Sequence, residues 1–270
     1  MIIDFHTHIF PDNLAQRAID ALEKGIKNAS DIDYKAEHNA AKKDLLHSMD
    51  VCGIDISVTL PVATKPAQVQ SINEFAQRIN MEKRLVSFAA FHPYMPDTDG
   101  ELEKIAAAGF RGIKIHPESQ ELFIDSPEAV HIINKAYELG LLVVLHTGYD
   151  LGFPPPSHCS PKRLKSALEF FDGSNVIAAH FGGFRMWEDV YKYLAGENIY
   201  LDTSLTVRDI DKELFLAICE KHTAGKILYG SDSPWEKQNT AYEYMKAWNV
   251  PDMDRICYKN AQKLLNINYS

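Results

Sequence analysis

The sequence has 270 residues, 46% of them hydrophobic and 24% charged, which is an ordinary composition for a globular protein with a sizeable buried core. Its length allows one barrel of alternating strands and helices, a fold that needs about 250 residues. The net charge of -9 and the lack of any long basic run argue against a nucleic-acid surface, because phosphate binding needs clustered Lys and Arg.

Cysteines and apolar runs limit the setting further. The four cysteines are scattered and form no CxxC pair, so neither a zinc finger nor a disulfide-rich scaffold is expected. No apolar stretch approaches the roughly 18 residues of a membrane span, and the N-terminus lacks the pattern of a signal peptide. We therefore expect a cytoplasmic protein with reduced thiols that binds neither membrane nor nucleic acid.

Eight short apolar runs rich in β-branched residues recur along the chain. Each is continuously hydrophobic rather than alternating, as in parallel strands covered on both faces. In chain order they are Ile2–Phe5, Ile56–Leu60, Leu85–Phe91, Gly112–Ile115, Leu141–Leu145, Asn175–Ala179, Ile199–Leu201 and Ile227–Tyr229. After the first gap the runs start 24 to 34 residues apart, which is the size of one strand–helix unit.

Segments of helical period lie between these runs, for example Pro127–Leu139, Pro161–Phe171 and Arg208–Lys221. Ser126 and Ser160 each precede a proline and are typical helix N-caps. Eight strands at this spacing predict an α/β fold, one closed (β/α)8 TIM-type barrel forming a single domain over residues 1–270. The alternative, a doubly wound sheet, is disfavoured because no GxGxxG motif follows the first strand.

The first strand–helix connection is the longest and contains an insertion from about Pro11 to Tyr34. Connections at the carboxyl end of the strands build the active sites of such barrels, so the insertion is a candidate lid. A surface helix without a functional part explains it equally well.

Polar side chains stand at the ends of most predicted strands. They are His6, His8, His92, His116, His146, His180, Asp202 and Asp232. Because the strand ends converge on one face of a barrel, these side chains are expected to crowd one cavity. His6 and His8 are two residues apart on an extended chain, so both point the same way and can hold one ion. Catalytic zinc keeps a position open for water beside its protein ligands, and His146 and Asp232 complete a suitable set.

The motifs around these residues resemble those of a known family. They are Asp-Phe-His6-Thr-His8 on the first strand, His146-Thr-Gly on the fifth, Ala-His180-Phe-Gly-Gly on the sixth and Gly-Ser-Asp232-Ser-Pro on the eighth. In order and spacing they resemble the amidohydrolase superfamily, and more narrowly its amidohydrolase-2 branch, which includes aminocarboxymuconate-semialdehyde decarboxylase. The resemblance implies that His6, His8, His146 and Asp232 hold one divalent metal, with Zn²⁺ as the first choice. It also implies that His180 is a non-ligand, or a ligand of a second metal, that acts as a general base or orients the water.

The fourth strand carries Lys114 and His116, which alternate onto the same face and can both reach the cavity. Binuclear members of the superfamily have a carboxylated lysine at this position that bridges two metals, whereas in the mononuclear branch the lysine is not carboxylated. The resemblance favours one metal over two metals bridged by Lys114. Lys114 then either binds a substrate carboxylate or pairs with a carboxylate inside the barrel, and both alternatives stay open.

This metal set predicts an enzyme that acts on a small molecule. A divalent ion lowers the pKa of a water to about 7 and polarises a substrate oxygen, and Asp232 or His180 can accept the proton. Hydrolysis of a C–N or C–O bond in an amide, lactone or ester is the first expectation. Nonoxidative decarboxylation of a small aromatic or unsaturated acid is the alternative, because it uses the same ligands. A non-catalytic metal-binding protein is disfavoured, since all four ligands are present.

Aromatic and basic residues follow the strand-end motifs, namely Phe10, Tyr149, Phe153, Arg185, Trp187 and Trp235. Together they suggest a flat or cyclic substrate with an anionic group, although each alone is more often ordinary packing. Arg185 and Trp235 join Lys114 and His116 as candidate residues for substrate binding or, for Lys114 and His116, for a second metal.

The other histidines are expected to have lesser roles. His158 either gates the site or caps the following helix, and the remaining ones are interpreted as structural residues in helical segments, namely His38, His47, His131 and His222. Barrels of this kind are commonly homodimers, but no interface is located by the sequence.

Overall fold

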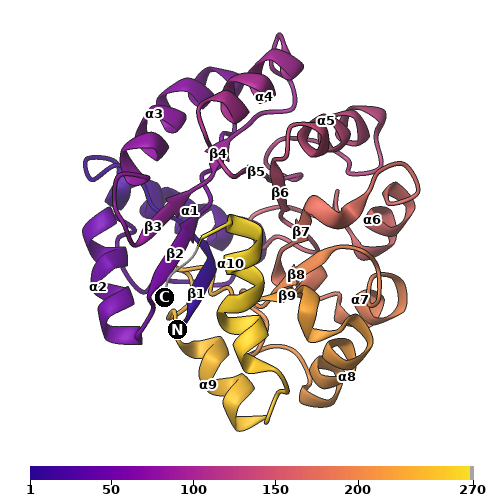
Figure 1. The fold of residues 1–270 in the computed structure, drawn as a ribbon. Coiled ribbons are helices and arrows are strands. Elements are labelled where there is room, and N and C mark those ends of the chain that lie inside the picture. The colour runs from indigo at the N-terminus through magenta and orange to yellow at the C-terminus, as the bar shows by residue number, and fades with distance from the viewer. Residues whose placement is uncertain (268–270) are drawn as a thin grey trace.

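Short parallel strands surround a central core, and helices pack around them (Figure 1). The protein is seen in a computed structural model, of which residues 1–267 are described. The strands are β1 (Ile3–Thr7), β2 (Ile56–Thr59), β3 (Leu85–Ser87), β4 (Ala89–Ala90), β5 (Gly112–Ile115), β6 (Leu142–Leu145), β7 (Val176–Ala178), β8 (Tyr200–Asp202) and β9 (Ile227–Leu228). The helices are α1 (Ala15–Ser30), α2 (Lys42–Cys52), α3 (Val69–Ile79), α4 (Thr98–Ala107), α5 (Pro127–Glu138), α6 (Pro161–Ala167), α7 (Trp187–Tyr193), α8 (Lys212–His222), α9 (Thr240–Ala247) and α10 (Asn260–Leu265).

The third predicted strand is divided into β3 and β4. β3 pairs with β2, and β4 pairs with β5, all in parallel. The chain changes neighbours at Phe88, whose N–H donates to the carbonyl of Thr59 at 2.9 Å. The two sheets, β1-β2-β3 and β4-β5-β6-β7-β8-β9, are therefore joined along one stretch of chain.

The ring of strands closes where the end of β9 meets β1. The N–H of Phe5 donates to the carbonyl of Tyr229 at 2.8 Å, and the N–H of Asp232 donates to the carbonyl of His6 at 2.8 Å. An isolated parallel bridge between Thr7 and Ser233 follows. These contacts do not form a regular ladder, but they place β9 beside β1. The predicted α/β fold, a (β/α)8 barrel, is confirmed.

Alternation along β6 shows how the strands separate two apolar cores. Leu142 and Val144 belong to an inner cluster, whereas Val143 and Leu145 belong to the larger outer cluster shared with the helices. The inner cluster includes Leu265 of α10, which crosses the barrel at the end where β1 begins (Figure 1). The opposite end, where the strands finish, carries the polar side chains.

The helix starts depend on local capping. The predicted N-caps Ser126 and Ser160 are confirmed, because each side chain accepts a hydrogen bond from a backbone N–H in the first turn. The helix predicted over Arg208–Lys221 instead begins at Lys212, because the carboxylate of Asp211 accepts a backbone N–H and caps it there. α6 ends earlier than predicted.

The insertion in the first connection folds as α1 and an extended segment that lies against the loop after β9. The N–H of Glu37 donates to the carbonyl of Pro234 at 2.7 Å. Nε2 of His38 lies 2.9 Å from Oγ of Ser233. The prediction of a helical His38 is wrong, because these contacts hold its segment outside any helix. The extended segment that contains Glu37 and His38 is thus hydrogen-bonded to the residues that directly follow Asp232.

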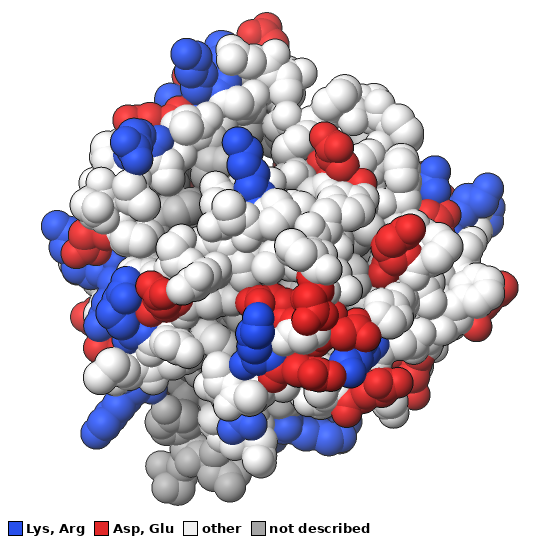
Figure 2. All heavy atoms as spheres, turned by 90° about the horizontal axis from the view of Figure 1, so that it is seen from above, with Lys and Arg blue, Asp and Glu red and all other residues white. Residues whose placement is uncertain are grey.

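Charged side chains of both signs are interspersed on the face drawn in Figure 2. Ion pairs link neighbouring helices, for example Lys135 with Glu103 and His131 with Asp99, both at 2.7 Å across α4 and α5. That face shows no continuous basic surface. Within residues 1–267, no helix is long and apolar enough to cross a membrane.

Candidate metal centre

β1 carries His6 at an irregularity in its pairing. Between Asp4 and Thr7, β1 advances three residues while β2 advances two. Such a bulge re-aims the side chains beside it and is common near active sites. Phe5 packs in the inner core, while His6, only 1% exposed, reaches the polar groups at the strand ends.

Asp202, at the end of β8, orients His6. Nδ1 of His6 lies 2.9 Å from Oδ2 of Asp202, which is fully buried. Oδ1 of Asp202 accepts the N–H of His180 at 3.1 Å, the N–H of Ser204 at 3.0 Å and also the Ser204 hydroxyl. Because a carboxylate only accepts, the proton of the neutral His6 ring belongs on Nδ1, and Nε2 carries a free lone pair.

His8 is oriented in the same way by a backbone carbonyl. Its Nδ1 donates to the carbonyl of Leu60 at 2.8 Å, so Nε2 is the nitrogen that faces Asp232. The side chain is 19% exposed, which makes His8 the more accessible of the two histidines.

Asp232 faces both free imidazole nitrogens. Its Oδ1 lies 3.2 Å from Nε2 of His6 and 3.0 Å from Nε2 of His8. This oxygen is buried and has no hydrogen-bond donor. Burial by itself would raise the pKa of Asp232, but the neighbouring His6, His8 and Lys114 outweigh burial and lower the pKa. Asp232 is therefore an ionised carboxylate.

The backbone is strained at two residues of this site. Asp232 has a φ of 67° and His180 a φ of 57°, both in the left-handed region. Asp and His tolerate this region better than most residues, but it still costs on the order of 1 kcal/mol each. Strain of this kind is typical of functional sites.

Three potential metal-ligand atoms thus converge. They are Nε2 of His6, Nε2 of His8 and Oδ1 of Asp232. Ligand atoms of a tetrahedral zinc ion with bonds of about 2.0–2.1 Å are roughly 3.3 Å apart, close to the spacings seen here. The three residues form a group suited to a metal ion, with Asp202 as the outer carboxylate that such histidines usually have.

Lys114 of β5 contacts this group and is 1% exposed. Its Nζ lies 3.3 Å from Nε2 of His6, so its hydrogen-bond partner is an imidazole rather than a carboxylate. Burial lowers the pKa of Lys114 from 10.5 to about 8.

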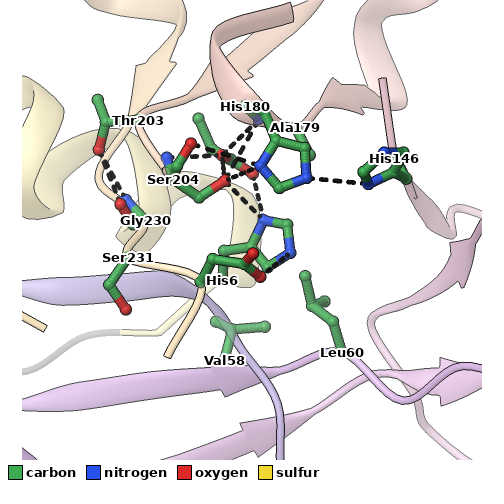
Figure 3. A network of polar contacts seen from close by, with 12 residues as sticks. His6, Val58, Leu60, His146, Ala179, His180, Thr203, Ser204, Gly230 and Ser231 are labelled. Atoms are coloured by element: carbon green, nitrogen blue, oxygen red, sulfur yellow. Dashed lines mark hydrogen bonds and ion pairs between the residues drawn. The ribbon is translucent and has the colours of Figure 1, made fainter. Parts of the chain in front are cut away.

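A chain of hydrogen bonds leads from Asp202 to His146 (Figure 3). Since Ser204 gives its hydroxyl proton to Asp202, its Oγ accepts from Nδ1 of His180, 3.0 Å away. Nε2 of His180 then accepts from Nδ1 of His146 at 3.0 Å. Both nitrogens of His180 are engaged, and Nε2 of His146 keeps a free lone pair.

His146 belongs to a second group rather than to the group of His6, His8 and Asp232. Its Nε2 lies 3.2 Å from the carbonyl of Tyr149 and 3.7 Å from Oδ2 of Asp150. His116 completes this second group, because its Nε2 lies 3.1 Å from the same Asp150 oxygen and its ring stacks on His146 with centroids 4.4 Å apart. The sequence pattern carries no signal for Asp150, which lies in the loop beyond the strand end.

The buried histidines stay neutral. Burial lowers the pKa of His146 to about 3 and the pKa of His6 and His180 well below its usual value. Neutral imidazoles with one free nitrogen are the form that ligates metals.

Space for a side chain is tight at Gly230, shortly after β9. A Cβ at Gly230 would lie 3.0 Å from Cβ of His6 and 3.4 Å from Cβ of Asp202. The hydroxyl of Thr203 donates to the carbonyl of Gly230 at 3.0 Å, which fixes the ends of β8 and β9 relative to each other (Figure 3).

The substrate-binding candidates lie in different surroundings. The rings of Trp235 and Tyr34 of the insertion are 6.1 Å apart, and the Tyr34 hydroxyl donates to the Trp235 carbonyl at 3.4 Å. Arg185 is exposed, and its guanidinium contacts Asp209 at 3.0 Å through two nitrogens. The charge of Arg185 is therefore already matched by a carboxylate.

Two predicted loop residues have other roles. Trp187 begins α7 instead of lining the site, and its buried indole N–H donates to the carbonyl of His180 at 3.1 Å. The N–H of His158 donates to Glu118 at 3.0 Å, and α6 is capped by Ser160. The capping alternative for His158 is therefore wrong.

Glu236 is a candidate that the sequence pattern did not indicate. It is 3% exposed, Oε1 pairs with Nε of Arg208 at 2.9 Å, and Oε2 has no hydrogen-bond partner. Burial raises the pKa of Glu236 to about 7. Its position directly after Trp235 was the only available signal.

The model of one family, described as amidohydrolase (Amidohydro_2), matches residues 3–267. The chain belongs to this family. It is therefore an enzyme of the metal-dependent amidohydrolase superfamily, and the predicted resemblance is confirmed. The comparison with curated proteins finds no match.

Solved structures similar to this amidohydrolase share its fold at low sequence identity. An uncharacterized TIM-barrel protein from Bordetella bronchiseptica has a TM-score of 0.74 at 16% identity and covers 98% of each chain. A dihydroxybenzoic acid decarboxylase from Polaromonas with bound manganese and 2-nitroresorcinol has a TM-score of 0.70 at 17% identity, covering 100% of this chain and 98% of its own. A probable 2-pyrone-4,6-dicarboxylic acid hydrolase from Acinetobacter baumannii has a TM-score of 0.64 at 17% identity, covering 98% and 99%.

Proposed function

We propose that this amidohydrolase hydrolyses a C–N or C–O bond, in an amide, lactone or ester, of a small, cyclic, anionic substrate. The proposal rests on one observation, the convergence of Nε2 of His6, Nε2 of His8 and Oδ1 of Asp232. These residues would hold one divalent metal, with Zn²⁺ as the first choice. His146, the fourth ligand expected from the family pattern, is linked to them through His180 and Ser204.

The residues around this position have separable tasks. A bound divalent metal supplies a Lewis acid that lowers the pKa of a water to about 7 and polarises a substrate oxygen. Asp232 is the better proton acceptor, because both nitrogens of His180 are engaged in hydrogen bonds. His180 orients His146, because both of its own nitrogens are engaged.

Recognition of an anionic substrate requires a basic side chain that is not already paired with a carboxylate. Arg185 is paired with Asp209, so Lys114 is the stronger candidate to meet an anionic group of the substrate. Trp235, partly buried beside Tyr34, offers a flat surface for a cyclic substrate. His116 stands on the same strand as Lys114 and contacts Asp150.

Nonoxidative decarboxylation of a small aromatic or unsaturated acid is the second candidate. A decarboxylase with bound manganese is among the similar structures, which supports it. It requires a proton donor to carbon, however, and the two nitrogens of His180 are both engaged. This occupancy favours hydrolysis.

The metal assignment is tested with His8→Gln and Asp232→Asn, two conservative changes. Each variant is expected to lose the metal that the wild-type protein retains after dialysis, as measured by inductively coupled plasma mass spectrometry. His47→Gln, which alters an exposed histidine of α2, is the control. Unchanged metal content in both variants contradicts the assignment.

The reaction is tested by assay. The metal-loaded protein is offered lactones, esters and amides with a carboxylate, beside aromatic acids, while acid release and CO2 are followed. Hydrolysis without CO2 supports the proposal, and CO2 release from an aromatic acid alone would replace it with the second candidate.

A further inference from the structure

We propose that Asp4 is a positioning residue that holds His6 and Asp232 in the arrangement that binds the metal. This role deepens the proposed function and rests on it, because it concerns the geometry of the same metal group. The side chain of Asp4 is fully buried and does not belong to that group. It acts on the two ligands through hydrogen bonds to the backbone beside them.

His6 points to the inside of the barrel, although its place in β1 would direct it outward. Successive side chains of a strand point to opposite faces, and Phe5 lies in the inner core. His6 nevertheless contacts Lys114, which is in register with the inner-core residue Val144. Two neighbouring side chains therefore reach the same face, which the shift in the pairing of β1 with β2 allows.

The carboxylate of Asp4 supplies a hydrogen-bond partner for the backbone at this shift. A bulge disrupts the ladder and leaves backbone groups without their usual partners. The N–H of His6 donates to Oδ1 of Asp4 at 3.2 Å. Ile3 and Phe5 belong to the inner core, so Asp4 between them points to the outer side of the strand. An outward side chain thus fixes the backbone of the residue that is turned inward.

The same carboxylate holds the chain on both sides of Asp232. The N–H of Ser231 donates to Oδ1 of Asp4 at 3.0 Å, and the Ser231 hydroxyl donates to Oδ2 at 2.6 Å. The hydroxyl oxygen of Ser231 accepts the N–H of Ser233 at 3.0 Å. Between these residues, the N–H of Asp232 donates to the carbonyl of His6 at 2.8 Å. Asp4 therefore links the two segments that carry the ligands, at the point where the barrel closes without a regular ladder.

Gln238 completes this buried network. Its Nε2 donates to Oδ2 of Asp4 at 2.8 Å and to the hydroxyl oxygen of Ser57 at 3.0 Å. Its Oε1 is buried and has no hydrogen-bond partner among residues 1–267. An asparagine at position 4 would keep Oδ1 for the two backbone N–H groups, and Gln238 could turn its Oε1 to the new amide. An alanine would leave both N–H groups without an acceptor.

The affinity of the metal-free protein for Zn²⁺, measured by competition with a chelator, tests this role. Asp4→Ala is expected to weaken binding by at least about 10-fold, because the groups that orient metal ligands have effects of this size. Asp4→Asn is expected to retain most of the wild-type affinity. The matched control is Ser57→Ala, which removes a buried hydrogen bond of the same network but none to the backbone beside a ligand. It is expected to bind Zn²⁺ like the wild type.

A second measurement needs no metal. Hydrogen exchange of the His6 amide, followed by NMR in the metal-free protein, should be faster in Asp4→Ala than in the wild type. The amide of Leu142, which donates to the carbonyl of Arg111 at 3.0 Å, should exchange at its wild-type rate. A general loss of stability would instead accelerate the exchange of both amides and would count against a local role of Asp4.

Wild-type affinity in Asp4→Ala, or an equal loss of affinity in Ser57→Ala, would overturn the positioning role. Should Asp4→Ala not fold, Ser231→Ala decides, because it removes only the hydroxyl that Asp4 accepts. It is expected to weaken Zn²⁺ binding, and an unchanged affinity there would also overturn the role. These results leave the metal group itself standing. A wild-type protein that binds no Zn²⁺ would overturn the metal group and, with it, the proposed function.

Discussion

The carboxylate of Asp202 lies 2.9 Å from Nδ1 of His6, and its other oxygen accepts the hydroxyl of Ser204. Through Ser204 and His180 it also determines which nitrogen of His146 carries the proton. One buried carboxylate at the end of β8 thus orients histidines of both candidate metal groups.

Asp202→Asn is expected to weaken metal binding by about 10- to 100-fold, because an amide presents a donor where His6 needs an acceptor. The dissociation constant can be measured by competition with a chromophoric chelator. Asp209→Asn, which alters the exposed partner of Arg185, serves as the control. An unchanged dissociation constant would show that Asp202 does not orient the ligand.

Ser204→Ala is expected to release the protonation of His180 and His146 from the control of Asp202. Nitrogen NMR of labelled histidine in the metal-free protein should show both rings with the proton on Nδ1 in the wild type, and a mixture in the variant. Ser71→Ala on the surface should leave these signals unchanged. Identical histidine signals in Ser204→Ala and the wild type would refute the proposed chain.

Glu236→Gln is expected to change how stability depends on pH. Burial raises the pKa of Glu236 from 4.5 to about 7. Between these values the folded state holds the proton and the unfolded state does not, so this residue makes the protein less stable as pH rises, by up to about 1.4 kcal/mol per unit. The stability contribution is present below pH 4.5 and lost by about pH 7.

The Glu236→Gln variant has no proton to lose at this position, so it lacks this decrease in stability with rising pH. Its free energy of unfolding in urea, relative to the wild type, should therefore be higher at pH 7 than at pH 5. A relative stability that is the same at both pH values would contradict the raised pKa of Glu236.

Phe88→Ala is expected to destabilise the barrel by about 3–5 kcal/mol, because the side chain is fully buried in the inner core and packs edge-on against Phe5. Chemical denaturation measures the change. Phe170→Ala removes a ring that is 66% exposed and should change stability by less than about 0.5 kcal/mol. Similar effects of the two substitutions would argue against this division of inner core and surface.

The pattern of apolar runs was sufficient to predict the barrel, because strands covered on both faces are apolar throughout and each repeat is local in the chain. Ser126 and Ser160 predicted helix starts for the same reason, since a cap acts on its own first turn. The division of the third strand at Phe88 was not predictable, because it depends on which neighbours the chain pairs with on each side.

The sequence by itself determined the family, the order of strands and helices, and the grouping of His6, His8 and Asp232, because strand ends meet at one face whatever the loops do. Only the tertiary structure decided that His146 faces Asp150, that His38 lies outside a helix, and that Asp202 and Ser204 direct the protons of the histidines. These features depend on side-chain direction and on contacts between loops far apart in the chain, and neither leaves a period or a motif in the sequence.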